Sequence, residues 1–579
     1  MKQLWKYMRE YRKECVLGPA FKLFEALLEL IVPLVIARMV DEGIRPGDQG
    51  AAVRCALLLA VLALLGLIAS VTAQFFAARA AIGFSSRLRR ELFAHIQTLS
   101  WRDQDQQGVS TLITRLTGDV NQLQTGINLG LRLLLRSPFV VFGAMIMAFT
   151  IDTGSALIFL LVIAVLFIIV FGIMLGTVRM NQRVREGLDD LTSATRENLT
   201  GVRVLRAFVQ EDRQIARFEK LNQLLTRAQL HVGRFTAAMN PLTFLVLNLA
   251  IVLLLHTGAL RVNSGTLTQG QVIALYNYMG QILVELVKLA NLIVTLSRSA
   301  ACGRRIAGTL AVSSSQQDGA LVFPASVPAS LVFEDVSIRY HAGADPALEH
   351  LSFRADPGET IGIIGGTGSG KSTLVHLIPR FYDVTEGRIL LAGRDIRDYT
   401  LSSLRAAVGI VPQHASLFRG TIRSNLLWGN PDASEDDLLQ AVSSAQASDV
   451  VAAKALGLDE PVTAGGKNFS GGQRQRLTIA RALVRKPRIL ILDDSASALD
   501  YATDAALRKS LRSLPFAPVT LIVSQRTSSV RFADRILVLD DGVCVGQGTH
   551  EELLVSCPVY REIDAAQRDA NEVKGGDGA

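Results

Sequence analysis

The sequence predicts two domains in one chain: a membrane all-α domain with six transmembrane helices, followed by an α/β domain of the P-loop type. Apolar residues make up 49% of the 579 residues and charged residues 19%, which is apolar-rich for a soluble chain. The apolar excess lies in the first 300 residues, and from about residue 331 short apolar strands alternate with helical segments. Ser313–Ser315, Pro324 and Pro328 mark a linker between the two patterns. We therefore expect the membrane domain over 1–310, the linker over 311–330 and the α/β domain over 331–579.

Six apolar segments are long enough to cross about 30 Å of hydrocarbon at about 1.5 Å per residue. They are 16–40, 53–81, 128–150, 155–178, 236–260 and 271–297. Lys and Arg gather in the N-terminal segment and in the two long connections, 82–127 and 179–235, and are nearly absent from the turns 41–50 and 151–154. The positive-inside rule then places both termini and both long connections in the cytosol. We expect a multi-pass protein of the cell (plasma) membrane.

The two long connections are rich in helix-forming residues and contain no proline. We therefore expect the spans to continue into the cytosol as helices, each pair joined by a short transverse helix, at about 109–118 and 207–215. The alternative is a pair of solvated helical hairpins.

Charge and cysteine usage exclude other classes. The net charge of +8 is not arranged as basic clusters interleaved with aromatic residues, so no nucleic-acid partner is expected. The five cysteines are scattered and form no C-x-x-C pair, which argues against a disulfide framework and against a zinc site.

The second domain contains a phosphate-binding motif. Gly365–Ser372 fits the P-loop pattern G-x-x-x-x-G-K-[ST], and it lies between an apolar strand and a helix, as the motif requires. Backbone N–H groups of the loop and of the following helix are expected to hold nucleotide phosphates. Lys371 is expected to reach the β- and γ-phosphates and Ser372 to bind Mg²⁺. The other residues expected to bind nucleotide here are Gly366, Thr367, Gly368, Ser369, Gly370 and Thr373.

Two further motifs follow. The apolar run Ile489–Leu492 ends in Asp493, which is expected to hold Mg²⁺. Ser470, Gly471, Gly472 and Gln473 begin a helix whose exposed N–H groups and dipole favour an anion.

These motifs, in this order behind six spans, resemble those of the ATP-binding cassette (ABC) transporters of the exporter type, and the resemblance covers nearly the whole chain. It implies ATP and Mg²⁺ as cofactors. It also implies that Tyr340 stacks on adenine, although a plain strand aromatic is the alternative, and that Gln413 senses Mg²⁺ and the attacking water. The Ser470 motif would cap a γ-phosphate bound by a second nucleotide-binding domain, and Ser497–Asp500 would cross the same interface. Phe469 stands where leucine is more usual.

The chain departs from the family pattern at its two catalytic positions. Asp494 stands where the family has the general-base glutamate, which shortens the reach by roughly 1.5 Å, about one carbon–carbon bond. Gln525 stands where the family has a histidine that contacts the γ-phosphate, and glutamine cannot carry its positive charge. Every binding element is kept, which favours a site that binds ATP and hydrolyses it slowly. A homodimer with two slow but active sites is the alternative.

The expected function follows from this asymmetry. The resemblance implies that a chain with six spans and one cassette works with a second ABC half-transporter, since the family works with twelve spans and two cassettes. A weak own site favours a non-identical partner that supplies the missing glutamate and histidine. We expect a subunit of a heterodimeric exporter that works in the lipid bilayer on small amphipathic or hydrophobic substrates. The alternatives are a homodimeric lipid or peptide exporter and a regulatory ATP-binding subunit.

Polar residues recur along two of the expected spans. They favour either a polar cavity whose acidic groups select cationic amphiphiles, or structural pairing of charges. The residues are Asn277, Gln281, Glu285, Lys288 and Asn291 in the last span and Lys22, Glu25 and Glu29 in the first, with Arg132 and Arg136 as candidates to offset them.

Overall fold

The computed structural model describes the chain except residues 1, 325–326, 342, 496–497 and 577–579, and it describes only the backbone of residues 2–3 and 568–576. The chain forms two compact units. The helical unit holds the chain up to Gln97 together with Gly108–Val312. The sheet unit holds Thr98–Gln107 together with the chain from Ser313 onward. The order of a helical part and an α/β part confirms the predicted fold class, and the exact domain bounds stay a prediction.

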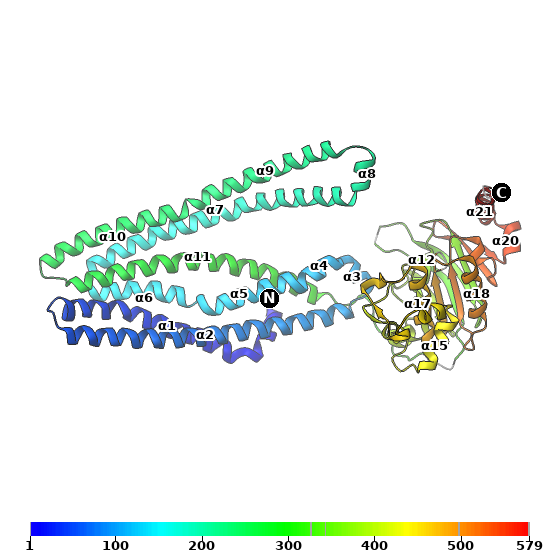
Figure 1. Cartoon of the computed structure of the whole chain (residues 1–579), viewed down its shortest axis with the longest axis horizontal. Coiled ribbons are helices and arrows are strands. Elements are labelled where there is room, and N and C mark those ends of the chain that lie inside the picture. Colours follow the sequence, from blue (N-terminus) through cyan, green and yellow to red (C-terminus); the bar gives the residue numbers. More distant parts are fainter. Residues whose placement is uncertain (1, 325–326, 342, 496–497, 577–579) are drawn as a thin grey trace. The chain divides into compact units, whose positions relative to one another are not determined.

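The described part of the helical unit consists of helices joined by short turns (Figure 1). They are η1 (Lys2–Tyr11), α1 (Arg12–Arg38), η2 (Met39–Ile44), α2 (Gln49–Thr98), α4 (Val109–Thr114), η3 (Arg115–Asp119), α5 (Val120–Leu133), α6 (Arg136–Ile151), α7 (Thr153–Thr200), α8 (Val202–Ala207), α9 (Glu211–Ala237), α10 (Met239–Asn263) and α11 (Gln269–Ala311).

Five helical segments among the described residues are long and apolar enough to cross a membrane: Gln49–Thr98, Val109–Ile151, Thr153–Thr200, Glu211–Asn263 and Gln269–Ala311. Helix α1, which carries the first predicted span, is not among them. Its apolar stretch is interrupted by Lys22, Glu25 and Glu29. The sixth span therefore stays a prediction.

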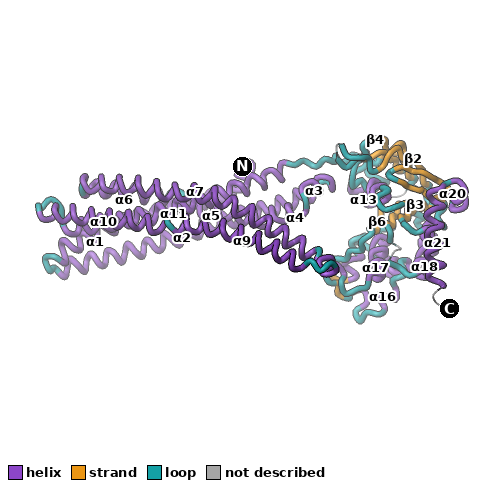
Figure 2. The backbone as a smooth tube through the Cα atoms, turned by 90° about the horizontal axis from the view of Figure 1, so that it is seen from above, coloured by secondary structure: helices purple, strands orange, loops and turns teal. Residues whose placement is uncertain are grey.

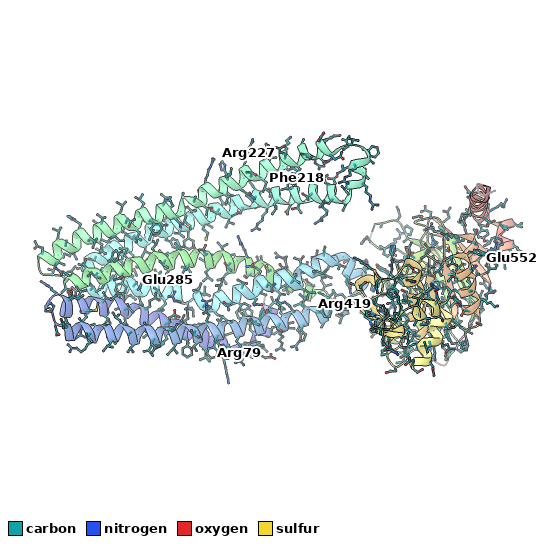
Figure 3. The ribbon with its side chains drawn as sticks, in the orientation of Figure 1. Arg79, Phe218, Arg227, Glu285, Arg419 and Glu552 are labelled. Atoms are coloured by element: carbon teal, nitrogen blue, oxygen red, sulfur yellow. The ribbon has the colours of Figure 1, made fainter. Side chains whose placement is uncertain are left out.

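A long hairpin of α7, α8 and α9 separates from the other helices of this unit toward α8 (Figures 1 and 2). None of the residues of α8 is buried, and in α9 only Leu225 is. Large apolar side chains stand exposed at its tip, where Phe208 is 71% and Val209 81% exposed. Phe218 and Arg227 project from the same arm in Figure 3. Exposed apolar side chains therefore gather at the tip of this hairpin.

The short helices within the two long connections lie earlier in the chain than predicted. The first is α3 (Trp101–Gln107), and the segment 109–118 instead opens the next long helix, after a break at Gly108 with φ +76°. The second is α8, so that 207–215 straddles the end of α8 and the start of α9. Within the sheet unit, the Trp101 ring stacks on Phe381 at 4.3 Å between centroids.

The described residues of the sheet unit form three sheets and the helices around them (Figure 2). The strands are β1 (Leu331–Ile338), β2 (Leu348–Ala355), β3 (Thr360–Gly365), β4 (Glu386–Leu391), β5 (Arg394–Asp395), β6 (Val408–Val411), β7 (Gly420–Thr421), β8 (Pro461–Val462), β9 (Ile489–Asp493), β10 (Val519–Val523), β11 (Arg535–Asp540) and β12 (Val543–Gly548). Besides α3, the helices are α12 (Lys371–Leu377), α13 (Leu401–Ala407), α14 (Ile422–Leu426), α15 (Glu435–Ser444), α16 (Ser448–Ala452), η4 (Gly457–Asp459), η5 (Ala464–Gly466), α17 (Gly471–Val484), α18 (Tyr501–Arg512), α19 (Thr527–Val530), α20 (His550–Ser556) and α21 (Pro558–Gly576).

The central sheet has six strands in the order β12-β11-β3-β10-β9-β6, parallel except for β12. A second sheet, β2-β1-β4-β5, is antiparallel, and β7 pairs with β8. β3 and β9 are continuous apolar runs and are almost wholly buried, as expected for strands covered on both faces. The loops that follow β3, β9 and β10 leave the same edge of the sheet, which is where ligands bind in folds of this kind.

Candidate functional site

A pocket of about 370 Å³ lies at the carboxyl edge of the central sheet. A volume of a few hundred Å³ is typical of small-molecule sites. The residues that line it are Tyr340, Ala347, Thr367, Gly368, Gly370, Lys371, Ser372, Thr373, Gln413, Asp493, Asp494, Val523, Ser524 and Gln525. Most residues named from the sequence therefore meet at one place.

The P-loop wraps one side of this pocket between β3 and α12. Gly368 and Gly370 adopt φ of +87° and +91°, a left-handed conformation that glycine allows at low cost. A Cβ at Gly370 would come within 2.5 Å of the Ala347 carbonyl oxygen, so no side chain fits there. Gly366 and Ser369 belong to the loop without lining the pocket.

Lys371 is held by the loop itself. Its Nζ donates to the carbonyl oxygens of Gly365 (3.0 Å) and Gly366 (2.5 Å) and to Ser369 Oγ (3.2 Å). Burial lowers the pKa of this amine, and the nearby Asp493 and Asp494 oppose that shift. The cation is thus placed by neutral oxygen atoms at the mouth of the loop.

Oxygen ligands gather beside it. Asp493 ends β9, and its Oδ1 accepts from Ser372 Oγ at 3.5 Å, while Gln413 lines the same pocket. Burial raises the pKa of Asp493. A hydroxyl, a carboxylate and an amide oxygen form a donor set that suits Mg²⁺.

The two altered positions also face this pocket. Asp494 follows directly after β9 with φ +46°, a left-handed conformation that Asp tolerates better than most residues, and its N–H donates to the Val523 carbonyl at 3.0 Å. Burial raises the pKa of Asp494, against the effects of Arg526, Lys371 and a hydrogen bond with the Gln413 side chain. Gln525 lies just beyond the end of the neighbouring strand β10.

Tyr340 also lines the pocket. Its hydroxyl donates to Thr373 Oγ1 at 3.0 Å, and its ring meets Tyr382 edge to face at 4.9 Å. The Tyr382 hydroxyl in turn donates to Asp105 Oδ2 of α3 at 2.6 Å. The tyrosine ring is therefore fixed at a pocket wall, as a stacking platform for a base requires.

The Ser470 motif does not line this pocket. Ser470 caps α17 through a capping box: its Oγ accepts from Gln473 N at 3.3 Å and its N–H donates to Gln473 Oε1 at 3.0 Å. A Cβ at Gly471 would meet no atom within 4 Å, so the helix start is open. Phe469, the unusual residue before it, is buried in a hydrophobic cluster of the sheet unit, with Lys454 Nζ 4.9 Å from the centre of its ring. Of the expected Ser497–Asp500 segment, Ser497 lies outside the described residues, and Asp500 caps α18.

Sequence reasoning missed three residues that line the pocket. Val523 and Ser524 precede Gln525, so the end of the apolar strand signals them. Ala347 belongs to no sequence motif. It lies at the pocket because the pairing of β1 with β2 brings it there, and no local pattern indicates this.

The charged residues of the helical unit form a second candidate site. Arg136 donates to Glu285 Oε1 at 2.6 Å and to Glu29 Oε2 at 2.5 Å, and Lys288 pairs with Glu285 at 2.8 Å. Lys22 pairs with Glu25 at 2.6 Å. Glu285 lies within the helical bundle and is 3% exposed (Figure 3). Each of these acids has a cation partner, so the structure favours structural pairing over a cavity of free carboxylates.

Comparison with known proteins agrees with this architecture. The model of the ABC transporter transmembrane region matches residues 16–286, and that of the ABC transporter matches residues 348–497. An uncharacterized ABC transporter ATP-binding protein of Mycobacterium tuberculosis is 36% identical over 97% of each chain.

Relatives with named activities are also similar over the full length. An ATP-dependent lipid A-core flippase of Hahella chejuensis is 30% identical over 95% of this chain and 96% of its own. A putative multidrug export ATP-binding/permease protein of Bacillus subtilis is 31% identical over 98% of this chain and 99% of its own. The solved structure of a bacterial Atm1-family ABC exporter with ATP bound superimposes with a TM-score of 0.77 at 26% identity, over 97% of this chain and 98% of that one. The chain belongs to the ABC transporter family, as an exporter half-transporter that carries its transmembrane and ATP-binding domains in one polypeptide.

Proposed function

We propose that this protein is one subunit of a heterodimeric exporter of hydrophobic or amphipathic compounds. Its own ATP site binds nucleotide and hydrolyses it slowly, while its Ser470 motif completes the site of a different subunit. The protein works in the cell membrane with both termini in the cytosol. ATP closes the two cassettes on each other, and hydrolysis at the partner's site reopens them.

One observation carries this proposal: the residues that would hold ATP all keep the family pattern, and the two that would cleave it do not. Asp494 and Gln525 line the same pocket as Lys371 and Ser372. General-base catalysis raises a reaction rate by about 10²–10⁴-fold, and it requires the base to lie within hydrogen-bond distance of the attacking water. Because the side chain of Asp494 is one methylene shorter than glutamate, it loses much of this rate gain. Glutamine at 525 donates a hydrogen bond without positive charge.

The need for a second chain rests on two surfaces. The start of α17 at Ser470 is open and away from the pocket of its own chain, and a helix N-terminus of this length favours an anion. The α7–α9 hairpin exposes apolar side chains at Phe208, Val209 and Phe218. A second half-transporter would cover both.

Magnesium would be held by Ser372, Asp493 and Gln413, whose oxygen atoms share the pocket. Such an ion would neutralise charge on the nucleotide phosphates. Lys371 and the loop N–H groups would bind the same phosphates from the other side.

The substrate class rests on the relatives and on charge. Relatives over the full length bear the names of a lipid A-core flippase and a multidrug exporter. The paired acids of the helical unit leave no free carboxylate at Glu285 to select cations. We therefore expect the helical unit to transport amphipathic molecules without requiring that they carry a particular charge.

The test is restoration of the family pattern. The double variant Asp494→Glu with Gln525→His, purified in lipid nanodiscs, should hydrolyse ATP at least about tenfold faster than the wild-type chain, because it regains general-base geometry. The double variant Asp494→Glu with Gln525→Ala is the matched control. Equal turnover of the wild type and the restored variant would contradict the proposal.

The same assay separates the alternatives. A homodimeric lipid or peptide exporter predicts that the lone wild-type chain couples its ATP turnover to substrate transport. A regulatory subunit predicts that the restored variant gains turnover yet moves no substrate in vesicles, even with the other half-transporter present.

A further inference from the structure

The C-terminal helix α21 reaches back to the loop that carries Gln525. The side-chain Nε2 of Gln567 donates to the Gln525 carbonyl oxygen at 2.7 Å. Its Oε1 accepts from Thr527 N at 2.9 Å and from Thr527 Oγ1 at 3.2 Å. One primary amide therefore bridges both ends of a loop forty residues away in sequence. Because a backbone carbonyl only accepts and an N–H only donates, the orientation of this amide is determined.

The loop needs such a bridge. It joins the end of β10 at Val523 to the start of α19 at Thr527, and at a helix start the first N–H groups have no partner inside the helix. The Arg526 residue before α19 makes no side-chain cap. Gln567 fills that role for Thr527 and at the same time fixes the carbonyl of Gln525.

Helix α21 is itself firmly anchored. Tyr560 is fully buried in a cluster with Ile364 of β3, Val530 of α19 and Val538 of β11, and its hydroxyl bonds His550 Nδ1 at 2.7 Å. Gln567 follows Tyr560 by seven residues, which is two turns, so both lie on the same face of the helix. The buried Tyr560 therefore fixes helix α21, and with it the position of the Gln567 side-chain amide beside the loop.

We propose that Gln567 is a positioning residue for the nucleotide site: it holds the loop so that the side chain of residue 525 faces the phosphate end of the pocket. It acts through Gln525 and does not line the pocket. This inference rests on the proposed role of Gln525 at the γ-phosphate.

The experiment is a double-mutant cycle in the full chain in nanodiscs, with Gln567→Ala, Gln525→Ala and both together. Gln567→Ala should lower kcat for ATP by about three- to tenfold, because the three hydrogen bonds of the amide are lost, with KM within about twofold of wild type. In the Gln525→Ala background the same change should have no effect on kcat. Gln567→Asn, which keeps the amide on a shorter side chain, should recover part of the rate. Glu562→Ala, an exposed change on the same helix, is the control.

Backbone hydrogen exchange supplies a readout independent of catalysis. The Thr527 amide should exchange faster in Gln567→Ala and as in wild type in Glu562→Ala. An unchanged exchange rate, an unchanged kcat, or an equal loss of kcat with and without the Gln525 side chain would each overturn the inference. The proposed function fails on a different result, namely the absence of a gain from Asp494→Glu with Gln525→His.

Discussion

The buried cations of the two units differ in their partners. In the helical unit, Arg136 lies between Glu29 and Glu285, two carboxylates from different helices. In the nucleotide pocket, Lys371 donates to two carbonyl oxygens and one hydroxyl and, among the residues that the structure describes, to no carboxylate. Neutral acceptors can be exchanged for phosphate oxygens without separating an ion pair. The paired cation Arg136 therefore suits a structural role, whereas Lys371, which has only neutral acceptors among the described residues, suits the binding of an anionic ligand.

Breaking the pair in the helical unit should have the largest effect. Arg136→Ala leaves the buried Glu285 carboxylate with Lys288 as its remaining cation partner, and breaking a buried ion pair costs up to about 3–5 kcal/mol. The variant should show a large drop in thermal unfolding temperature in detergent. Arg136→Leu with Glu285→Leu should recover most of that loss. A full transport defect at unchanged unfolding temperature would instead assign the cluster to the substrate path.

Removing the unpaired cation should act on the ligand and spare the fold. Lys371→Ala should weaken ATP binding by about 10²-fold, because hydrogen bonds to charged groups contribute about 1.5–3 kcal/mol. Titration with a fluorescent ATP analogue measures this. Lys288→Ala, which removes a paired cation from the helical unit, should leave the affinity for ATP unchanged. An equal loss of ATP affinity in both variants would contradict the different roles assigned to the two cations.

A smaller effect is expected at Tyr340, which lines the same pocket. Tyr340→Ala should weaken ATP binding about tenfold, since stacking of a base on an aromatic ring contributes about 1–3 kcal/mol. Tyr340→Phe keeps the ring and loses only the hydrogen bond to Thr373. If the phenylalanine variant were as weak as the alanine variant, the hydroxyl and not the ring would be the functional group.

The smallest effect concerns a scaffold charge inside the sheet unit. Asp103 is buried, which raises its pKa, but hydrogen bonds from Ser100 and Ser315 outweigh this and hold the pKa below its ordinary value. Its stabilisation, about 1 kcal/mol, is therefore full above the ordinary Asp pKa and is lost as the pH falls through the lower folded value. Asp103→Asn should unfold at a lower temperature than wild type at pH 7, and the difference should shrink below about pH 4. A difference that grew on acidification would contradict the sign of the shift.

Most residues that local motifs single out line one pocket. Gly365–Ser372, Asp493 and Gln525 are each tied to the end of an apolar strand, and parallel strands bring their carboxyl ends to one edge. The roles assigned to these residues stay predictions. The order of a helical part and an α/β part also followed from composition and pattern alone.

The rest depends on contacts between distant segments. From the sequence, Arg136 is only one candidate to offset the acids of the spans, and no local pattern identifies Glu285, 149 residues away, as its partner or shows that Gln567 bonds Gln525. The short helix predicted at 109–118 lies instead at Trp101–Gln107, because the positive φ of Gly108 ends that helix before Val109. Helix α3 belongs to the sheet unit, where the Trp101 ring stacks on Phe381. The third predicted span is divided at Leu134 and Leu135, where α5 ends and α6 begins.

The nucleotide retained by the purified wild-type chain tests the account most directly. After incubation with ATP and Mg²⁺ and rapid removal of free nucleotide, the bound fraction should be mostly ATP, with phosphate released far more slowly than the roughly 1 s⁻¹ at the lower end of typical enzymes. Bound nucleotide that is mostly ADP, with phosphate released at about that rate or faster, would contradict a site that binds ATP without readily cleaving it.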